Sequence, residues 1–290
     1  MTRWKRGLWA ALLLLLGACR GAVPEQDADP ALWVLRDADT TIYLFGTIHT
    51  LKPGVRWFDD AVRDAYDSSD QLVLELVMPD AASMAALTQE LGTRRDGPPL
   101  SARLTPARRE KLAAALRQQG AAADALDRAD PWLAVTTLAG IDAERKGFSR
   151  DNGAEEVLAR AGKPVTGLET ARDQLSWLDG LSMPTQMALL DQTIDGLDTP
   201  DDTLAQVVDA WAHGDVERLG MLMNADLKAT PELAQTMLYA RNRRWAGWIA
   251  RRMVRPGTVF VAVGAGHLAG PGSVQDELAR RGLRVERVRY

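Results

Sequence analysis

The chain has 290 residues, of which 46% are hydrophobic and 26% are charged, and its formal net charge is −4. This is the composition of an ordinary globular protein, and the length suits one large domain or two small ones. The slightly acidic balance argues against a nucleic-acid partner, which normally requires a basic face.

The first 31 residues are predicted to lie outside the folded domain. Three basic residues precede the apolar run Leu8–Leu16, and small residues then lead to Cys19, which is the layout of a secretory signal peptide. The run is too short for a comfortable membrane-spanning helix. Residues 16–19, Leu-Gly-Ala-Cys, resemble a bacterial lipobox. We therefore expect residues 1–18 to be removed and Cys19 to be lipidated; the alternative is a plain signal peptide that is cut nearby.

Cys19 is the only cysteine of the chain, so no internal disulfide can form. Its lipidation would also determine where the protein is located. Residues 19–31 are polar, contain two prolines and are predicted to be a tether. Arg20 is not the aspartate that typically retains a lipoprotein at the inner membrane. In a Gram-negative cell we therefore expect an exported protein, lipid-anchored at the cell envelope, on the outer membrane and facing the periplasm.

The first elements after the tether are predicted to be strands. Apolar runs at 32–36 and 41–46 flank the turn signal Asp37-Ala38-Asp39 and predict a β-hairpin. A helical segment is expected near 59–69. Residues 71–77 form a short apolar run that fits a buried strand.

The middle of the chain, about 80–256, is predicted to be mostly helical. Thr105-Pro106 opens one helix, since threonine caps a helix and proline suits its first turn. Thr230-Pro231 opens another, which can run to about Arg255. One strand, 163–169, interrupts this region.

The last part is predicted to be a strand at 257–263, a loop, a helix near 273–281 and a strand at 283–289. Residues 257–290 are too few to fold alone, so they must complete the sheet that starts near residue 32.

The predicted fold class is therefore α/β. A mixed sheet is built from the N- and C-terminal βαβ-like halves of one domain, residues 32–290. A largely helical insertion, about 80–256, lies between the two halves.

Two of the three histidines follow the same pattern, an apolar run that breaks at Gly-x-x-His. His49 follows the strand that contains Gly46, and His267 follows the strand that ends before Gly264. Ligands collect at the carboxyl ends of strands in open α/β sheets, and glycine lets the backbone turn sharply there. Glu75, at the end of a third apolar run, is costly to bury unless it is paired or binds a cation. Two imidazoles and a carboxylate can form the first shell of a divalent metal.

Each of these residues has a plainer explanation. A histidine after a strand is more often a hydrogen-bonded structural residue than a ligand, and Glu75 can lie in solvent where its strand ends. His213 lacks the strand context and is interpreted as a surface or capping residue, and Trp245 as core. A group of arginines on the predicted helix near 231–255 is interpreted as a solvated face: Arg241, Arg243, Arg244, Arg251 and Arg252.

The segment GAGHLAG also resembles a loosened dinucleotide fingerprint, with Glu286 near the place of a ribose-binding acid. No further βαβ unit follows it, so a nucleotide site is not favoured. The P-loop, the His-Glu-x-x-His helix and the Gly-x-Ser-x-Gly elbow do not occur in the sequence.

The order of several motifs resembles the TraB/GumN family, which is related to the Tiki metalloproteases. The motifs are LFGTIH, LVLEL, GKPVTGLET, the pair Arg241-Asn242, and VFVAVGAGHLAGPGSV. The resemblance covers about residues 32–290. It implies an α/β core formed by the two ends of the chain with helices between them, distantly similar to erythromycin esterases and to haem-binding ChaN-like proteins.

The resemblance also implies roles for particular residues. Tiki-type relatives are manganese- or cobalt-dependent peptidases, and their metal site would fall here on His49, His267 and Glu75. Arg241 and Asn242 would orient the substrate or support the ligands. Manganese or cobalt is accordingly expected rather than zinc.

We therefore expect a metal-dependent hydrolase of the cell envelope that acts on a peptide or protein substrate. Glu75 is either a metal ligand or the general base that deprotonates the bound water, and Arg241 or Asn242 stabilises the oxyanion. The alternatives are a lipoprotein that binds haem or a metal without hydrolysis, an esterase that needs no metal, and a structural protein with an inactive site.

Overall fold

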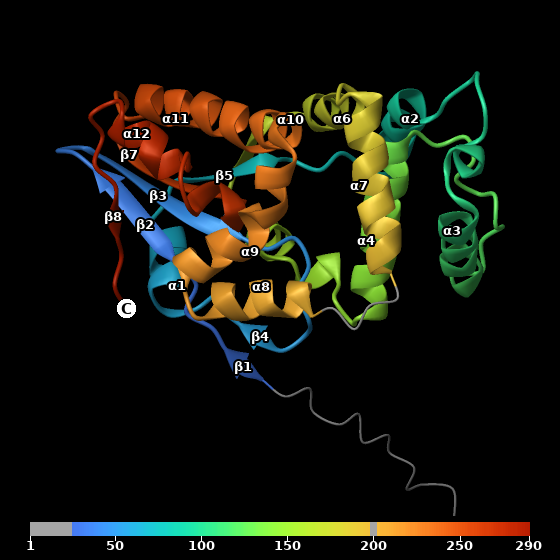
Figure 1. Ribbon diagram of the computed structural model, residues 1–290. Coiled ribbons are helices and arrows are strands. Elements are labelled where there is room, and N and C mark those ends of the chain that lie inside the picture. The colour runs from blue at the N-terminus through green and yellow to red at the C-terminus, as the bar shows by residue number, and fades with distance from the viewer. Residues whose placement is uncertain (1–24, 198–201) are drawn as a thin grey trace, which may run out of the picture.

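The computed structural model describes residues 25–197 and 202–290 (Figure 1). The predicted signal peptide and Cys19 lie outside the described residues and stay predictions. Within the described ranges, no helix has both the length and the apolar character needed to cross a membrane.

A six-stranded mixed sheet forms the centre of the molecule, in the order β6-β5-β7-β3-β2-β8. The four strands from β6 to β3 are parallel, whereas β2 runs antiparallel to both of its neighbours. The strands are β2 (Leu32–Arg36), β3 (Thr40–Thr47), β5 (Gln71–Leu76), β6 (Val165–Glu169), β7 (Gly257–Gly264) and β8 (Glu286–Arg287). The predicted α/β class is confirmed.

The two ends of the chain meet in this sheet, as the sequence predicts. The expected hairpin is β2 and β3, paired from Leu32↔Phe45 to Arg36↔Thr41. β7 then inserts between β3 and β5, in register from Thr40↔Gly257 to Thr47↔Gly264. The C-terminal segment therefore supplies a central strand of a sheet that begins near residue 32.

The predicted strand at 283–289 is wrong in its length. β8 contains only Glu286 and Arg287, which pair with Val34 and Trp33 of β2. It is an edge strand, and both of its residues are exposed. β8 has a neighbour strand on one side only, and its exposed side chains add no packing that would extend the ladder.

Helices cover both faces of the sheet (Figure 1). Neighbouring residues of β3 point to opposite faces, as in any strand: Phe45 packs with α1, α5, α8 and α9, and Leu44 packs with α11 and α12. These helices are α1 (Asp60–Asp67), α5 (Ala154–Arg160), α8 (Thr203–Ala212), α9 (Val216–Ala229), α11 (Ala240–Arg252) and α12 (Val274–Ala279).

Only part of the predicted helical insertion, 80–256, forms a core of its own beside the sheet (Figure 1), because α5, α8, α9 and α11 of that range cover the sheet. The helices of this part are α2 (Ala81–Gly92), α3 (Pro106–Gln118), α4 (Pro131–Arg145), α6 (Ala171–Asp179) and α7 (Met183–Gly196). α3 begins as predicted, because Thr105 Oγ1 accepts a hydrogen bond from the Arg108 N–H.

The helix predicted from Thr230-Pro231 is present but is not uniform. It comprises α10 (Pro231–Ala234), a π-helical turn (Gln235–Tyr239) and α11, which ends at Arg252 rather than near Arg255. A π turn inserts an extra residue into a helix and changes the direction in which the following side chains point. Arg241 and Asn242 come directly after it.

The predicted tether is wrong for its last residues. β1 (Gln26–Asp27) pairs with β4 (Val55–Arg56), and Ala28 is buried in the main core. Asp29 N–H also donates to the Ala212 carbonyl. The polar sequence does not predict that this segment docks on the fold, because the docking uses backbone hydrogen bonds and one small side chain, Ala28. The folded part therefore begins by Gln26 and not at Leu32.

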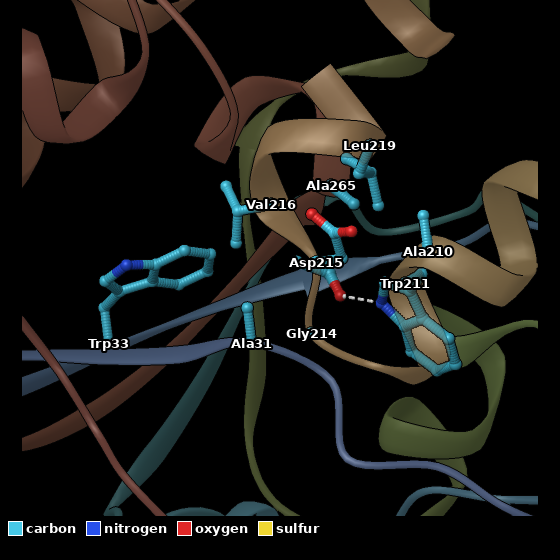
Figure 2. Close-up of a pocket in the computed structure, with 10 residues that line it drawn as sticks. Ala31, Trp33, Ala210, Trp211, Gly214, Asp215, Val216, Leu219 and Ala265 are labelled. Atoms are coloured by element: carbon cyan, nitrogen blue, oxygen red, sulfur yellow. Dashed lines mark hydrogen bonds between the residues drawn. The ribbon is translucent and has the colours of Figure 1, made fainter. Parts of the chain in front are cut away.

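Gly46 has a different role from the sharp turn that the sequence suggested. It lies inside β3, and its φ is not positive. A Cβ at this position would lie 3.1 Å from Cα of Ala265, so glycine allows a close approach of the segment after β7. Figure 2 shows the small apolar pocket beside this contact, where Trp211 Nε1 donates to the Gly46 carbonyl at 2.7 Å.

Candidate functional site

The carboxyl ends of the parallel strands bring several polar side chains to one edge of the sheet. Glu75 is in β5, Glu169 is the last residue of β6 and Gly264 is the last residue of β7. His49 follows β3 by two residues, and His267 lies in a short 3-10 helix directly after β7. Side chains 218 residues apart in sequence (267 minus 49) therefore face the same region.

Gly264 lies at the meeting point of the three predicted metal ligands. A Cβ added there would lie 3.1 Å from Glu75 Oε1 and 3.6 Å from His267 Cδ2. The same position is 4.0 Å from His49 Cε1. Its N–H donates to Glu75 Oε1 at 2.6 Å. Like Gly46, Gly264 has no positive φ, so the absent side chain serves close contact and not a turn.

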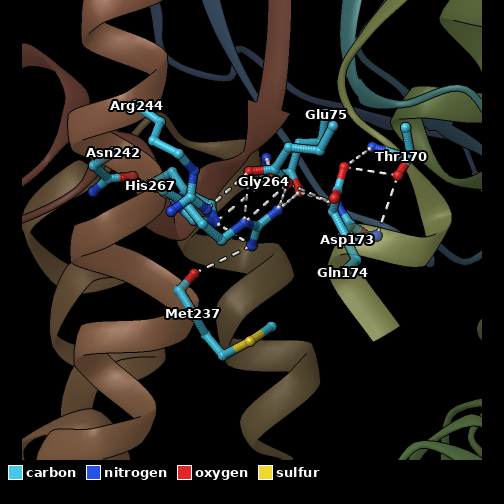
Figure 3. Close-up of polar contacts among 11 residues, drawn as sticks. Glu75, Thr170, Asp173, Gln174, Met237, Asn242, Arg244, Gly264 and His267 are labelled. Atoms are coloured by element: carbon cyan, nitrogen blue, oxygen red, sulfur yellow. Dashed lines mark hydrogen bonds and ion pairs between the residues drawn. The ribbon is translucent and has the colours of Figure 1, made fainter. Parts of the chain in front are cut away.

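A chain of hydrogen bonds fixes the ring of His267 (Figure 3). Asn242 Nδ2 donates to the Gly272 carbonyl at 2.7 Å, so its Oδ1 faces His267 Nδ1 at 2.6 Å and accepts the Nδ1 proton. The lone pair of the neutral ring is then on Nε2. Trp245 packs against the ring, with centroids 4.4 Å apart. The fixed Nε2 lies 3.7 Å from Glu75 Oε1.

Arg241 lies between the acceptors of this site. Its Nη2 donates to Glu75 Oε2 at 2.5 Å, and its Nη1 donates to His267 Nε2 at 3.1 Å. Its Nε and Nη2 also donate to Glu169 Oε2, at 3.1 and 2.9 Å. The side chain is 6% exposed. The interpretation of the arginines as one solvated face is therefore wrong for Arg241, which the π turn directs toward the sheet, while Arg243 and Arg244 are exposed.

His49 has a different setting. Its side chain is 70% exposed, and its Nδ1 lies 2.7 Å from Glu155 Oε1 in the first turn of α5. The same carboxylate oxygen accepts a hydrogen bond from Thr47 Oγ1. Within the part of the chain that the structure describes, no hydrogen bond reaches His49 Nε2.

The charges of the site follow from these contacts. Burial lowers the pKa of His267 to about 3, so this ring is neutral at pH 7. The charge of Glu155 raises the pKa of His49 to about 9. Burial alone would raise the pKa of Glu75, but two neighbours lower it to about 2: His267, in the protonated form that this ring takes only in acid, and the permanently charged Arg241. Glu75 is therefore ionised at neutral pH.

His49, His267 and Glu75 are side chains of the kind that bind a divalent cation, but Arg241 already donates to Glu75 and His267. In the described ranges, no three His, Cys, Asp or Glu side chains form a ready metal site. Both imidazoles nevertheless have the outer hydrogen bond that ligating histidines almost always make: His49 to Glu155 and His267 to Asn242. The metal role of His49, His267 and Glu75 stays a prediction.

Other predicted positions lie where the sequence put them. His213 is the exposed C-cap of α8, and its Nδ1 contacts the Asp209 carbonyl at 2.8 Å. Trp245 is buried in the core as predicted, and it also contacts His267. Glu286 is exposed on the edge strand β8.

The sequence patterns did not identify two acidic residues of the site, Glu169 and Glu155. Glu169 ends the predicted strand 163–169, so the argument that selected Glu75 at a strand end applies equally to it. Glu155 gave no such signal, because it follows a loop and begins a short helix. Only the fold brings it to His49.

Comparison with known proteins gives a family match over most of the chain. Residues 31–287 match the sequence model of the TraB/PrgY/gumN family. An uncharacterized protein of Treponema pallidum (strain Nichols) is 26% identical over 94% of this chain and 89% of its own length. Metalloproteases TIKI2 and TIKI1 of Danio rerio are 26% and 25% identical over 92% of this chain. The matched regions span 62% and 65% of those two proteins. No solved structure matches the chain.

Proposed function

The chain belongs to the TraB/PrgY/gumN family, and from this premise we propose that it is a metal-dependent hydrolase that cleaves peptide bonds. The similarity to two Danio rerio metalloproteases supports a peptidase-like activity. The observation that carries the proposal is the meeting of His49, His267 and Glu75 around Gly264.

His49 and His267 would hold the cation through Nε2, because the Nδ1 of each ring is engaged by an outer acceptor. Glu75 would complete the set as a ligand, or accept a proton from the attacking water. When bound, such a cation supplies a water of lowered pKa and a Lewis acid for the scissile carbonyl. Manganese or cobalt remains the expected metal.

Arg241 has two tasks in this proposal. It donates to Glu75 Oε2 and His267 Nε2, so these two hydrogen bonds would have to break if both atoms were to hold a cation. Its bond from Nε to Glu169 does not involve the metal ligands and can keep the guanidinium beside the site. From there the guanidinium stabilises negative charge that develops on the carbonyl oxygen. Asn242 holds His267 in the tautomer whose lone pair is on Nε2.

One observation favours a second candidate, a hydrolase that needs no metal. Arg241 already supplies a buried positive charge to both Glu75 and His267. The exposed pair His49–Glu155 then resembles a general base with its orienting carboxylate, which acts in the fraction of molecules whose His49 ring has lost its proton. This candidate predicts that activity survives a chelator and is lost in His49→Ala.

The test combines metal binding with peptide cleavage. The purified protein is titrated with Mn²⁺, Co²⁺ and Zn²⁺ by calorimetry and then screened against a peptide library with each metal. His49→Ala and His267→Ala should both lose binding and cleavage, whereas His213→Ala, which changes an exposed histidine outside the site, should keep both. Folded His49→Ala and His267→Ala proteins with full binding and activity would falsify the proposal.

The proposed location is the cell envelope, with the chain exported and lipid-anchored through Cys19. The lipobox-like sequence at residues 16–19 supports this location. The substrate would then be a peptide or protein of the envelope. Cys19→Ser should move the protein from the membrane fraction to the soluble fraction, and an unchanged membrane fraction would contradict the anchor.

A further inference from the structure

The segment before and at the start of α5 docks directly on the residues around His49. Ala154 N–H donates to the Ile48 carbonyl at 3.0 Å, and Leu51 and Ser149 exchange two backbone hydrogen bonds, at 3.0 and 3.1 Å. These contacts join two parts of the chain that are about a hundred residues apart in sequence. They bring the first turn of α5 against the loop that carries His49.

Gly153 makes this docking possible. A Cβ on this residue would lie 2.1 Å from the His49 carbonyl oxygen, a distance that real Cβ atoms do not show. Its φ of −59° is open to any residue, so the backbone conformation does not require glycine. The close approach to His49 does require it. Glu155 is two residues further on.

The carboxylate of Glu155 reaches two groups of the His49 loop through one oxygen. Oε1 lies 2.7 Å from His49 Nδ1 and also accepts from Thr47 Oγ1. Thr47 is buried at the end of β3, so its hydroxyl is a fixed donor. Glu155 itself is only 21% exposed. The carboxylate is therefore held from the side of the sheet and presents its oxygen to the ring.

Packing does not hold the ring of His49 in the same way. The side chain is 70% exposed, and no aromatic contact to it is present among the described residues. His267, by contrast, is buried and packs on Trp245. The contact of His49 Nδ1 with Glu155 is therefore the main restraint on the direction of Nε2.

We propose that Glu155 is a positioning residue, which orients His49 so that its Nε2 points into the site around Gly264. This inference rests on the proposed function, in which His49 holds a divalent cation. Partners of this kind fix the orientation of a ligating histidine and raise its basicity, and their loss typically weakens metal binding or activity about 10- to 100-fold. Thr47 and Gly153 act through Glu155: one holds its carboxylate, and the other allows its helix to approach.

The test uses three variants of the full chain with a matched control. Glu155→Ala removes the acceptor, and Glu155→Gln keeps an oxygen that can still accept the Nδ1 proton. Glu156→Ala changes the next residue, an exposed acid beside Arg160. Circular dichroism and thermal unfolding first establish that each variant is folded. Calorimetry with Mn²⁺ and Co²⁺ then gives Kd, and peptide cleavage gives kcat and KM.

Glu155→Ala should bind each metal about 10- to 100-fold more weakly than the original protein. Its kcat should fall with little change in KM, since Glu155 does not contact the substrate in this proposal. Glu155→Gln should recover most of the binding, and Glu156→Ala should behave like the original protein. A folded Glu155→Ala protein with unchanged Kd overturns the inference, as does a Glu155→Gln protein that binds no better than Glu155→Ala.

A measurement without metal separates this inference from the proposed function. With ¹⁵N-labelled histidine, the three imidazoles can be assigned through their own alanine variants. The Nδ1 resonance of His49 should move in Glu155→Ala and stay in Glu156→Ala. If it does not move, Glu155 does not hold the ring. If it moves while the original protein binds no metal and cleaves nothing, the proposed function fails and the contact of Glu155 with His49 stands.

Discussion

His49 and His267 follow the same sequence pattern at neighbouring strand ends, yet their surroundings are opposite. His49 is mostly exposed and contacts a carboxylate, whereas His267 is buried, contacts an amide oxygen and packs on a tryptophan. The pKa of His49 is raised to about 9, chiefly by Glu155, and the pKa of His267 is lowered to about 3 by burial.

The difference shows that one motif can supply two unlike ligands. His267 is neutral at pH 7 and its Nε2 is directed by Asn242, so it can accept a cation without losing a proton. His49 carries a proton that cation binding has to release. Water surrounds most of the His49 ring, so its ion pair with Glu155 contributes little to the stability of the fold.

The largest change in the free energy of unfolding is expected from the buried half of the site, around Arg241. Arg241→Met removes the guanidinium that pairs with Glu75 and Glu169, and it leaves two carboxylates buried. Breaking a buried ion pair in this way should lower the free energy of unfolding by about 3 to 5 kcal/mol. Arg243→Met, on the exposed side of the same helix, should change it by no more than about 0.5 kcal/mol. Urea unfolding measures both, and equal effects would contradict the buried pair.

The pH dependence of stability tests the buried histidine directly. The folded pKa of His267 lies below the unfolded value of about 6.5, so acid favours the unfolded chain. The stability that neutral His267 contributes is present above pH 6.5 and is lost as the pH falls toward 3. Between these limits the loss is up to about 1.4 kcal/mol per pH unit.

The matched comparison for this pH effect is His267→Gln. Both proteins are unfolded in urea at several pH values between 4 and 7 with a chelator present. As the pH falls, the original protein should lose unfolding free energy relative to His267→Gln. A constant difference would mean that His267 titrates alike in the folded and unfolded chains.

A smaller loss of stability is expected from a substitution of Gly264, the glycine that lies beside both histidines. Gly264→Ala places a Cβ 3.1 Å from Glu75 Oε1, so the carboxylate has to shift from the Gly264 N–H. Overpacking of this kind typically costs about 1 to 3 kcal/mol. Gly140→Ala is the control, because it is an exposed helical position with open space, and it should stabilise by about 0.5 to 1 kcal/mol. Thermal unfolding of the two variants should therefore shift in opposite directions.

The smallest change in stability is expected at His49. His49→Ala removes an exposed side chain and should alter the free energy of unfolding by about 0.5 kcal/mol or less. Under the proposed function it should nevertheless abolish metal binding, as His267→Ala does. A large loss of stability in His49→Ala would show that the exposed histidine has a structural role.

The sequence predicts the strands and the histidines of the site better than the contacts between its buried side chains. Apolar runs ending in Gly-x-x-His located both histidines, because buried parallel strands have a strong hydrophobic signal. The position of Glu75 followed from the same signal. The contact of Arg241 with Glu75 did not, because the π turn at Gln235–Tyr239 resets the helix direction and leaves no pattern in composition.

Contacts that depend on backbone approach were equally invisible in the sequence. Glu155 reaches His49 because Gly153 lies against a carbonyl oxygen, and no periodicity reports such a contact. The segment at Gln26–Asp27 joins the fold through backbone pairing, although its side chains are polar. Sequence patterns record which side chains are buried, and these contacts bury almost none.

The pairing of β3 with β7 also determines when the molecule can fold. The register Thr40↔Gly257 joins residues 217 positions apart (257 minus 40), and β7 is the strand between β3 and β5. Contacts of such long range have a high entropic cost of loop closure and are typical of slow folding. A growing chain that has not reached Gly264 lacks the strand that joins the hairpin to the rest of the sheet. His49 and Glu75 can therefore meet only late, after almost all of the chain has been made.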